Sequence, residues 1–274
     1  MSLTGKIQLY SRILSAKRRA VPDFLLVGVQ KSGTTSLFHY LTQHPQVIPP
    51  VKKEIQYFDK NYRKGFSWYK AHFPVKDAIC NKCITGEAST DYSFHPLAPE
   101  RIKSDLGRPK LILLLRDPAK RAISHFYHYL NKGRETLSIN DVFDIEEERL
   151  SHFYQGSLES NFMKDSESKR YIRFSYKKKG LYLEQIKRIH KLFGKEALFI
   201  GSVEEMTQHP VDFYRRICTF LNIDNSVLPE DLSAKNLGDY QVENPEILES
   251  LREYYREHNQ ELFDYIGQEF PWGD

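Results

Sequence analysis

The stretch Asp23–Pro45 reads DFLLVGVQKSGTTSLFHYLTQHP and combines three structural signals in a fixed order. Phe24–Val29 is a short apolar run that contains a glycine, which is typical of a buried central strand in a parallel sheet. A loop containing Gly28 and Gly33 follows, and the apolar spacing after it predicts a helix that stops at Pro45. A strand, a glycine-containing loop and a helix in this order predict a phosphate-binding loop.

The lysine of this loop is displaced from the position that a nucleotide P-loop requires. That loop has the pattern G-x-x-x-x-G-K-[ST], whereas here Thr34 follows Gly33 and the lysine is Lys31. The next apolar run ends in Arg116 and then Asp117, so no magnesium-binding acid stands directly at its end. We therefore expect the loop to hold a phosphate beside a lysine and without a metal ion. The expected donors are the loop N–H groups and hydroxyls of Ser32, Gly33, Thr34, Thr35 and Ser36.

Further apolar runs and helical patterns alternate along the chain. The runs Lys110–Pro118 and Glu196–Met206 predict two more strands. Helical patterns cover about 119–130, 181–193, 211–221 and 245–266, the last with a proline at its start. Strands that alternate with helices predict an α/β fold of three layers, in which helices flank a central parallel sheet.

The remaining segments indicate how the chain divides. Residues 1–21 are basic and loosely amphipathic, and they predict a surface helix or tail before a single domain over 22–274. A membrane-surface role of this tail is a second interpretation. Residues 131–179 carry the clusters Glu146–Glu148 and Lys177–Lys179 and few apolar periods. They predict a polar insertion, either a lid over a site or a mobile surface segment.

Composition limits the class of protein. The 274 residues contain 40 Lys and Arg against 36 Asp and Glu, a balance too even to indicate a nucleic-acid partner. No apolar run reaches the ~18 residues of a membrane span and no apolar leader is visible, so we expect a cytoplasmic protein. A luminal Golgi domain trimmed of its anchor would look the same. Cys80 and Cys83 lack the second ligand pair of a zinc site, so we interpret them as ordinary loop thiols.

Several segments resemble one family in the same order. VGVQKSGTTSL is similar to the 5′-phosphosulfate loop, and LLLRDPAKRAISHF to the 3′-phosphate motif, of sulfotransferases that use 3′-phosphoadenosine 5′-phosphosulfate (PAPS). KEIQYFD, YRKGFSWYKAHFP, GEASTDYSFHP and YYREHNQELFDYIGQEFPW resemble segments of the carbohydrate branch, the heparan sulfate N- and 3-O-sulfotransferase domains. The resemblance runs from about Pro22 to Trp272. It implies transfer of the sulfuryl group from PAPS to a hydroxyl or amine, which leaves adenosine 3′,5′-bisphosphate.

The resemblance implies roles for residues near the sulfuryl group. Lys31 would stabilise the charge that develops on the leaving phosphate, although a lysine there could also merely attract the anion. Glu54 matches the catalytic base of the family. Taken alone, Glu54 is a surface carboxylate paired with Lys52 or Lys53. Lys53 itself would help to hold the sulfonate.

One predicted helix carries the 3′-phosphate motif and a candidate catalytic histidine. Arg116 and Ser124 would grip the 3′-phosphate, the arginine through a bidentate fork and the serine through its hydroxyl. His128 lies four residues after Ser124, hence on the same helical face, whereas His125 should point elsewhere. The resemblance implies that His128 acts in catalysis or orients the acceptor, and a structural histidine is the alternative.

Two more residues are implied in cofactor binding. Tyr182 resembles a family position near the nucleotide, with core packing as the alternative. Lys235, in SAKNLGDY, matches the lysine of a loop over the cofactor. Asn236 stands where the family has glycine, and no arginine follows.

The acceptor side departs from the family in two places. Residues 221–234 are short and lack cysteine, where the heparan sulfate enzymes have a Cys-bracketed loop, and Ala88 stands where they have lysine. A smaller sugar, glycolipid or secondary metabolite fits these departures at least as well as a long anionic glycan. The alternatives to a sulfotransferase are a nucleotide-dependent kinase with an atypical P-loop and a non-catalytic nucleotide-binding protein. The sequence leaves the oligomeric state open.

Overall fold

The computed structural model describes residues 3–155, 162, 165–233, 235 and 245–272. At its centre, five parallel strands form a sheet in the order β2-β3-β1-β4-β5. After β1 the chain continues to one side of the sheet, and after β4 it continues to the other. The loops after β1 and β4 therefore flank the crevice at the carboxyl edge where α/β sheets bind ligands. The strands are β1 (Phe24–Gly28), β2 (Val47–Ile48), β3 (Ile84–Ala88), β4 (Lys110–Leu115) and β5 (Leu198–Ser202).

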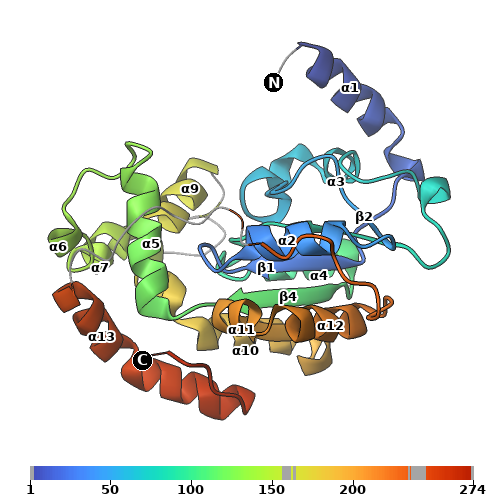
Figure 1. Ribbon diagram of the computed structural model, residues 1–274. Helices are drawn as coiled ribbons and strands as arrows, with labels where there is room; N and C mark the ends of the chain where they lie inside the picture. The colour runs from blue at the N-terminus through green and yellow to red at the C-terminus, as the bar shows by residue number, and fades with distance from the viewer. Residues whose placement is uncertain (1–2, 156–161, 163–164, 234, 236–244, 273–274) are drawn as a thin grey trace.

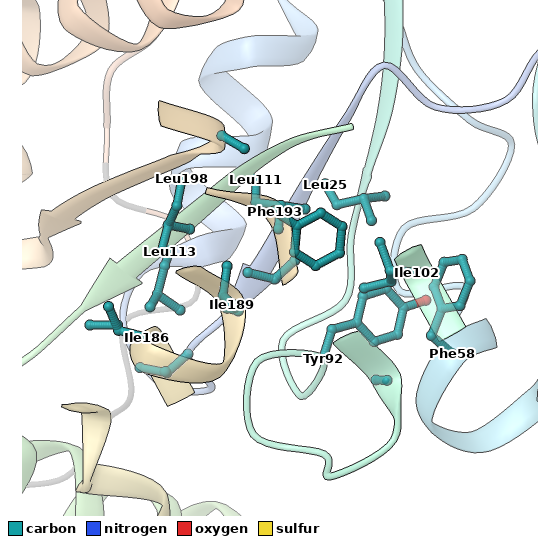
Figure 2. Close-up of a cluster of buried hydrophobic side chains, with 14 of the residues drawn as sticks. Leu25, Phe58, Tyr92, Ile102, Leu111, Leu113, Ile186, Ile189, Phe193 and Leu198 are labelled. Atoms are coloured by element: carbon teal, nitrogen blue, oxygen red, sulfur yellow. The ribbon is translucent and has the colours of Figure 1, made fainter. Parts of the chain in front are cut away.

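The two faces of the sheet carry separate apolar cores, because successive side chains of a strand point to opposite sides. Phe24 and Leu26 of β1 lie in the core formed with α2 (Thr34–Thr42), α11 (Val203–Gln208) and α12 (Pro210–Leu221). The next core, on the other face, is formed with α4 (Ala98–Leu106) and α10 (Tyr182–Phe193). Figure 2 shows strand leucines meeting apolar side chains of α10 in this second core: Leu25, Leu111, Leu113 and Leu198 with Ile186, Ile189 and Phe193.

The remaining helices lie around this three-layer body (Figure 1). α5 (Pro118–Leu130) follows β4, and the long α13 (Pro245–Ile266) packs against α5 and α10. Further α-helices among the described residues are α1 (Leu3–Leu14), α3 (Phe66–Lys70), α6 (Ile139–Val142), α7 (Glu146–Leu150) and α9 (Asp165–Phe174). Single 3-10 turns occupy Ala16–Arg18, Tyr62–Lys64, Lys76–Ala78, Ser151–Tyr154, Lys178–Gly180 and Lys195–Ala197, and a π-helical turn occupies Tyr57–Asn61.

The predicted α/β fold is confirmed, with two strands that the sequence did not reveal. β2 has only two residues, and β3 contains Thr85, Gly86 and Glu87, so neither forms the apolar run that signals a buried strand. The strand predicted to reach Met206 ends at Ser202. The Ser202 hydroxyl accepts from the N–H of Glu205 and caps α11, which starts the helix there.

The segment 131–179, predicted to be a polar insertion, also contributes buried residues to the domain. Phe153, Tyr171 and Ile172 are buried in an apolar cluster with Phe94. One member of each charge cluster is also buried: Lys179 is fully buried, and Glu146 accepts from the N–H groups of Lys177 and Lys178. A run of charged residues in a sequence usually indicates a solvent-exposed segment. Here one charged side chain of each run is buried and hydrogen-bonded to other groups of the protein. The lid function stays a prediction.

Cys80 and Cys83 also differ from expectation, because they form a disulfide where loop thiols were predicted. The two residues are three positions apart in an exposed turn, where Cys83 N–H donates to the Cys80 carbonyl at 2.9 Å and brings the side chains together. The basic N-terminal segment is helical from Leu3 to Leu14. Within the described residues, no helix combines the length and apolar character needed to cross a membrane.

Candidate functional site

The loop after β1 presents backbone donors at the start of α2. Lys31 and Gly33 both have positive φ angles, 73° and 77°. A Cβ on Gly33 would lie 2.8 Å from Cγ2 of Val203 and 3.0 Å from Cε of Met206, so glycine is required for space as well as for conformation. Because Gly33 is also the N-cap, it offers no side chain to the first N–H groups of α2. An anion is the favoured acceptor there, since the helix dipole also attracts negative charge.

Cationic side chains meet beside this loop. Arg116, just after β4, donates from Nη1 to the carbonyl oxygen of Lys31 at 2.9 Å. Burial lowers the pKa of Lys31, and the positive charges of Arg116 and Lys132 lower it further. Like charges this close repel each other, and an anion placed among them would remove the repulsion. The crevice therefore has the electrostatics of a site for a multiply charged anion.

Two serine hydroxyls on the segments that follow β1 and β4 are buried. Ser32, in the loop, is fully buried, and Ser124, on α5, is 1% exposed. Within the described part of the chain, neither Oγ has a hydrogen-bond partner. Buried polar atoms that lack partners are rare in native proteins, and a bound ligand is one way in which they are satisfied. Their positions fit a ligand that touches both the β1 loop and α5.

The first turn of α2 contacts Lys53 and Lys235, and Lys53 in turn approaches Glu54. Lys53 Nζ donates to Thr35 Oγ1 at 2.5 Å and lies 3.9 Å from Glu54 Oε1. Ser36 Oγ accepts from the backbone N–H of Lys235 at 2.8 Å. The ammonium group of Lys235 binds Asp231 Oδ2 at 2.5 Å, so only its backbone reaches α2. The structure thus gathers residues 31–36, 53, 54 and 235 around one helix start.

The segment that carries Glu54 is held by residues at and after the end of β3. Glu54 and Gln56 have positive φ angles of 56° and 54°, a conformation that costs about 1 kcal/mol or more in a non-glycine residue. Three backbone donors compensate for this cost. Glu54 N–H donates to the Ala88 carbonyl at 3.0 Å, Gln56 N–H to Ser89 Oγ at 3.0 Å, and Tyr57 N–H to the Tyr92 hydroxyl at 2.9 Å. Glu54 itself remains 42% exposed in its side chain.

Glu87, in the core, holds the two hydroxyl groups that accept hydrogen bonds from the Glu54 segment. This fully buried carboxylate accepts from the hydroxyls of Tyr69 and Tyr92 on Oε1, at 2.8 and 2.9 Å, and of Ser89 on Oε2, at 2.8 Å. Burial raises the pKa of Glu87 to about 7, although the three hydrogen bonds oppose that rise. Ser89 and Tyr92 therefore connect Glu87 to the backbone N–H groups of Gln56 and Tyr57, which follow Glu54 in the chain.

His128 is partly buried on α5, near the cationic side of the crevice. Its Nε2 accepts from Lys132 Nζ at 2.9 Å. Burial, followed by the charges of Lys132 and Lys31, lowers the pKa of His128 to about 4, so its imidazole is neutral at physiological pH. His125 is fully buried instead and lies 3.4 Å from Arg121 Nη1, consistent with the expected difference in direction.

A buried cluster of charges supports the loop residue before Lys31. Asp91 accepts from Lys179 Nζ and Lys60 Nζ, both at 2.9 Å, and Lys179 also donates to Gln30 Oε1 at 3.1 Å. Burial opposes ionisation, but the ammonium groups of Lys179 and Lys60 hold the pKa of Asp91 well below its usual range. No local pattern in the sequence indicates this cluster, since its members are separated by 31 and 88 positions.

Tyr182 lies in the core, where its hydroxyl donates to the carbonyl oxygen of Arg116 at 2.8 Å. This hydrogen bond holds the backbone of Arg116 in place just after β4. Sequence reasoning also passed over Lys132, whose charge acts on both Lys31 and His128. Among the described residues, no group of three or more His, Cys, Asp or Glu side chains is arranged to hold a metal ion.

A family model for the sulfotransferase domain matches residues 21–264 of this chain. The chain belongs to the sulfotransferase family. The match includes β1, the loop around Lys31, the Glu54 segment, α5 and the sheet, so every candidate residue described above lies inside it. The family predicted from the sequence is thereby confirmed.

Named relatives cover nearly the whole sulfotransferase domain at modest identity. The chain is 26% identical to the membrane-associated sulfotransferase kil1 of Dictyostelium discoideum, over 94% of this chain and 68% of that protein. It is 25% identical to mouse heparan sulfate glucosamine 3-O-sulfotransferase 3A1, over 95% of this chain and 66% of that protein. It spans only 23% of the bifunctional heparan sulfate N-deacetylase/N-sulfotransferase 1 of Caenorhabditis elegans, at 26% identity over 77% of this chain.

Solved structures share the fold. A sulfotransferase from Alicyclobacillus acidocaldarius superposes with a TM-score of 0.74 at 28% identity, covering 92% of this chain and 98% of that chain. A mouse sulfotransferase solved with adenosine 3′,5′-bisphosphate (PAP) superposes with a TM-score of 0.50 at 14% identity, covering 93% of this chain and 94% of that chain. The central parallel sheet with flanking helices is therefore the fold of known sulfotransferases.

The cytoplasmic location expected from the sequence is wrong in the light of these relatives. The relative from Dictyostelium discoideum is named a membrane-associated sulfotransferase. The sequence argument rested on the lack of an apolar span and leader, which leaves other modes of membrane association untouched.

Proposed function

We propose that this sulfotransferase domain takes the sulfuryl group from PAPS and transfers it in line to a hydroxyl or amine of a carbohydrate or small metabolite. The observation that carries the proposal is the pair of interacting cations Lys31 and Arg116 beside the start of α2. It is joined by the buried hydroxyls of Ser32, in the β1 loop, and Ser124, on α5, which lack hydrogen-bond partners within the described residues. These cations and hydroxyl groups suit a ligand that has phosphates at two separated positions. The PAP found in a solved sulfotransferase is such a ligand.

The residues of the crevice divide naturally between the two ends of the donor. The loop N–H groups, together with Ser32, Thr34, Thr35 and Ser36, would bind the 5′-phosphosulfate at the start of α2. Arg116 and Ser124 would bind the 3′-phosphate, since arginine offers a fork and serine a hydroxyl. Tyr182 would act on the 3′-phosphate end through the Arg116 backbone, and Lys235 would act on the 5′-phosphosulfate end through its backbone contact with Ser36.

Sulfuryl transfer needs a cation at the leaving oxygen and a base at the acceptor. As the acceptor oxygen or nitrogen bonds to sulfur, the bond from sulfur to the bridging oxygen breaks and its electrons stay on the phosphate. Lys31 would stabilise that charge, which is greater in the transition state than in the ground state. Glu54 would take the acceptor proton, and Lys53, which contacts both Thr35 and Glu54, would hold the sulfonate between them.

His128 has a narrower role in this proposal. Its imidazole is neutral at physiological pH, because burial and two lysines lower its pKa to about 4. A group with that pKa is a poor general base but can accept or donate one hydrogen bond. We infer that His128 orients the acceptor, or Lys132, and that Glu54 is the base.

The proposed acceptor is small. Relatives include enzymes named for heparan sulfate, which is a long anionic glycan. At the position where that family has a lysine, this chain has Ala88, which is fully buried at the end of β3 and adds no positive charge. A sugar, glycolipid or secondary metabolite with few negative charges fits that neutral position. A kinase is not favoured, because Lys31 is displaced from the P-loop position and the family match is to sulfotransferases.

The test is a transfer screen with radiolabelled PAPS against sugars, glycolipids and phenolic or amine metabolites. Glu54→Gln should bind the donor as tightly as the wild type and lose transfer, because the amide keeps the shape of the carboxylate but cannot take a proton. Glu147→Gln, at an exposed position on α7, is the control. Normal turnover by Glu54→Gln would exclude Glu54 as the base and leave His128 as the remaining candidate. Loss of donor binding would make Glu54 structural.

A further inference from the structure

The N-terminal segment carries a net positive charge without any acidic residue to balance it. Its first 22 residues contain five Lys or Arg and no Asp or Glu, more positive charge than the net +4 of the whole chain. The rest of the chain is therefore slightly negative. A concentration of one sign of charge at one end favours a partner of the opposite sign.

Part of this charge attaches the segment to the domain. Arg12 donates from Nε to the Ala71 carbonyl at 2.6 Å and from Nη2 to the Phe73 carbonyl at 2.9 Å. Arg19 Nη1 donates to the same Phe73 carbonyl at 2.9 Å. These bonds hold α1 against the end of α3, and Figure 1 shows α1 projecting from the body beyond that contact. Lys17 and Arg18 remain exposed at the base of the helix, where Arg18 Nη2 lies 3.7 Å from Oδ2 of the likewise exposed Asp77.

The outer face of α1 is apolar and uncovered. Ile7 is 63% exposed, Tyr10 70% and Leu14 89%. Positions 7, 10 and 14 follow the helical repeat and lie on one face, whereas Leu9, Arg12 and Ile13 are partly buried on the other side. Among the eight large apolar residues that are exposed in the described part of the chain, these three form a row on one helix. An apolar row next to basic residues is the pattern of a helix that lies in a membrane interface.

We propose that α1 binds the surface of an anionic phospholipid bilayer. Ile7, Tyr10 and Leu14 would enter the boundary between headgroups and acyl chains, to a depth of about 5–10 Å, while Lys17 and Arg18 contact lipid phosphates. A second copy of this chain is a poorer occupant of the same face, because it would bring two strongly basic segments together. This surface lies outside the crevice of the proposed reaction, so the two proposals stand or fall separately.

Co-sedimentation of the full chain with vesicles tests the proposal. The protein should bind vesicles of phosphatidylcholine and phosphatidylserine and should bind vesicles of phosphatidylcholine alone much more weakly. Lys17→Gln/Arg18→Gln should weaken binding to the anionic vesicles roughly 25-fold, since each basic residue near such a surface contributes roughly fivefold. Raised salt should reduce binding of the wild type, because the attraction acts within about 8 Å at physiological salt.

A matched pair of variants tests the apolar row. Tyr10→Ser/Leu14→Ser should lose vesicle binding, whereas Tyr254→Ser/Leu228→Ser, which removes one exposed tyrosine and one exposed leucine elsewhere, should keep it. Circular dichroism of each variant should match the wild type. Absence of binding, equal binding to neutral and anionic vesicles, or full binding by the α1 variant would overturn the proposal. A dimer in sedimentation velocity that Tyr10→Ser/Leu14→Ser abolishes would overturn it in favour of a contact between copies.

Discussion

Lys31 is the residue on which the proposed chemistry depends most. Its carbonyl accepts from Arg116, and burial with two neighbouring cations lowers the pKa of its ammonium group. Lys31→Ala should reduce transfer on the order of 10²–10³-fold, because it removes a charge aimed at the leaving oxygen. Lys191→Ala, at an exposed position on α10, should leave the rate unchanged. Turnover by Lys31→Ala within a few-fold of the wild type would exclude it from the mechanism.

Glu87 should leave a signature in the pH dependence of stability. Burial raises its pKa from 4.5 to about 7, so the native state binds more protons than the unfolded state between these values. The stabilisation that comes from protonated Glu87 is therefore complete below about pH 4.5, and it is lost as the pH rises through about 7. Urea unfolding at several pH values should show this fall in the wild type and a flatter profile in Glu87→Gln. An identical profile in both proteins would show that Glu87 is ionised in the native state throughout.

At the scale of single elements, the sequence was most informative where one local pattern decides the structure. β1, its loop and α2 follow from an apolar run, two glycines and helical spacing, and α13 has the predicted bounds Pro245–Ile266. β3 was missed because its sequence ITGEA contains a buried carboxylate and a glycine. That glutamate is tolerated only because Tyr69, Ser89 and Tyr92 donate to it, and hydrogen bonds from distant residues leave no periodic signal.

The link between β3 and the Glu54 segment can be tested with a matched pair. Ser89→Ala removes the acceptor of the Gln56 N–H as well as one hydrogen bond to Glu87. Tyr69→Phe removes one hydrogen bond to Glu87 and nothing from the segment. Ser89→Ala should lower stability by about 1–3 kcal/mol, since Glu87 Oε2 and the Gln56 N–H both lose the Ser89 hydroxyl. Tyr69→Phe should lower it by about 0.5–1.5 kcal/mol, since Glu87 Oε1 keeps the hydrogen bond from Tyr92. Only Ser89→Ala should also lower kcat, with KM for the donor unchanged. Equal kcat in the two variants would show that the segment keeps its shape without Ser89.

At the scale of the whole molecule, the candidate site draws on residues that are far apart in the sequence. The resemblance to sulfotransferases singled out Lys31, Glu54, Arg116 and Ser124. The structure adds that the strand order sets the β1 and β4 loops side by side, where Arg116 donates to the Lys31 carbonyl. The support of the site was not predictable in the same way. Lys179 belongs to a lysine run that suggests a solvated surface, yet it lies fully buried between Asp91 and Gln30. Pairings across such distances depend on the fold and not on local pattern.

Donor binding by calorimetry tests the central claim most directly, because it needs no acceptor. Adenosine 3′,5′-bisphosphate should bind at least roughly tenfold more tightly than adenosine 5′-phosphate, since charge-assisted bonds to the 3′-phosphate contribute about 1.5–3 kcal/mol each. Arg116→Ala and Ser124→Ala should reduce this difference in affinity, because each should weaken the binding of adenosine 3′,5′-bisphosphate and leave the binding of adenosine 5′-phosphate unchanged. ATP with magnesium should bind more weakly than adenosine 3′,5′-bisphosphate. Equal affinity for the two adenosine ligands, or a preference for ATP with magnesium, would contradict a PAPS-dependent sulfotransferase.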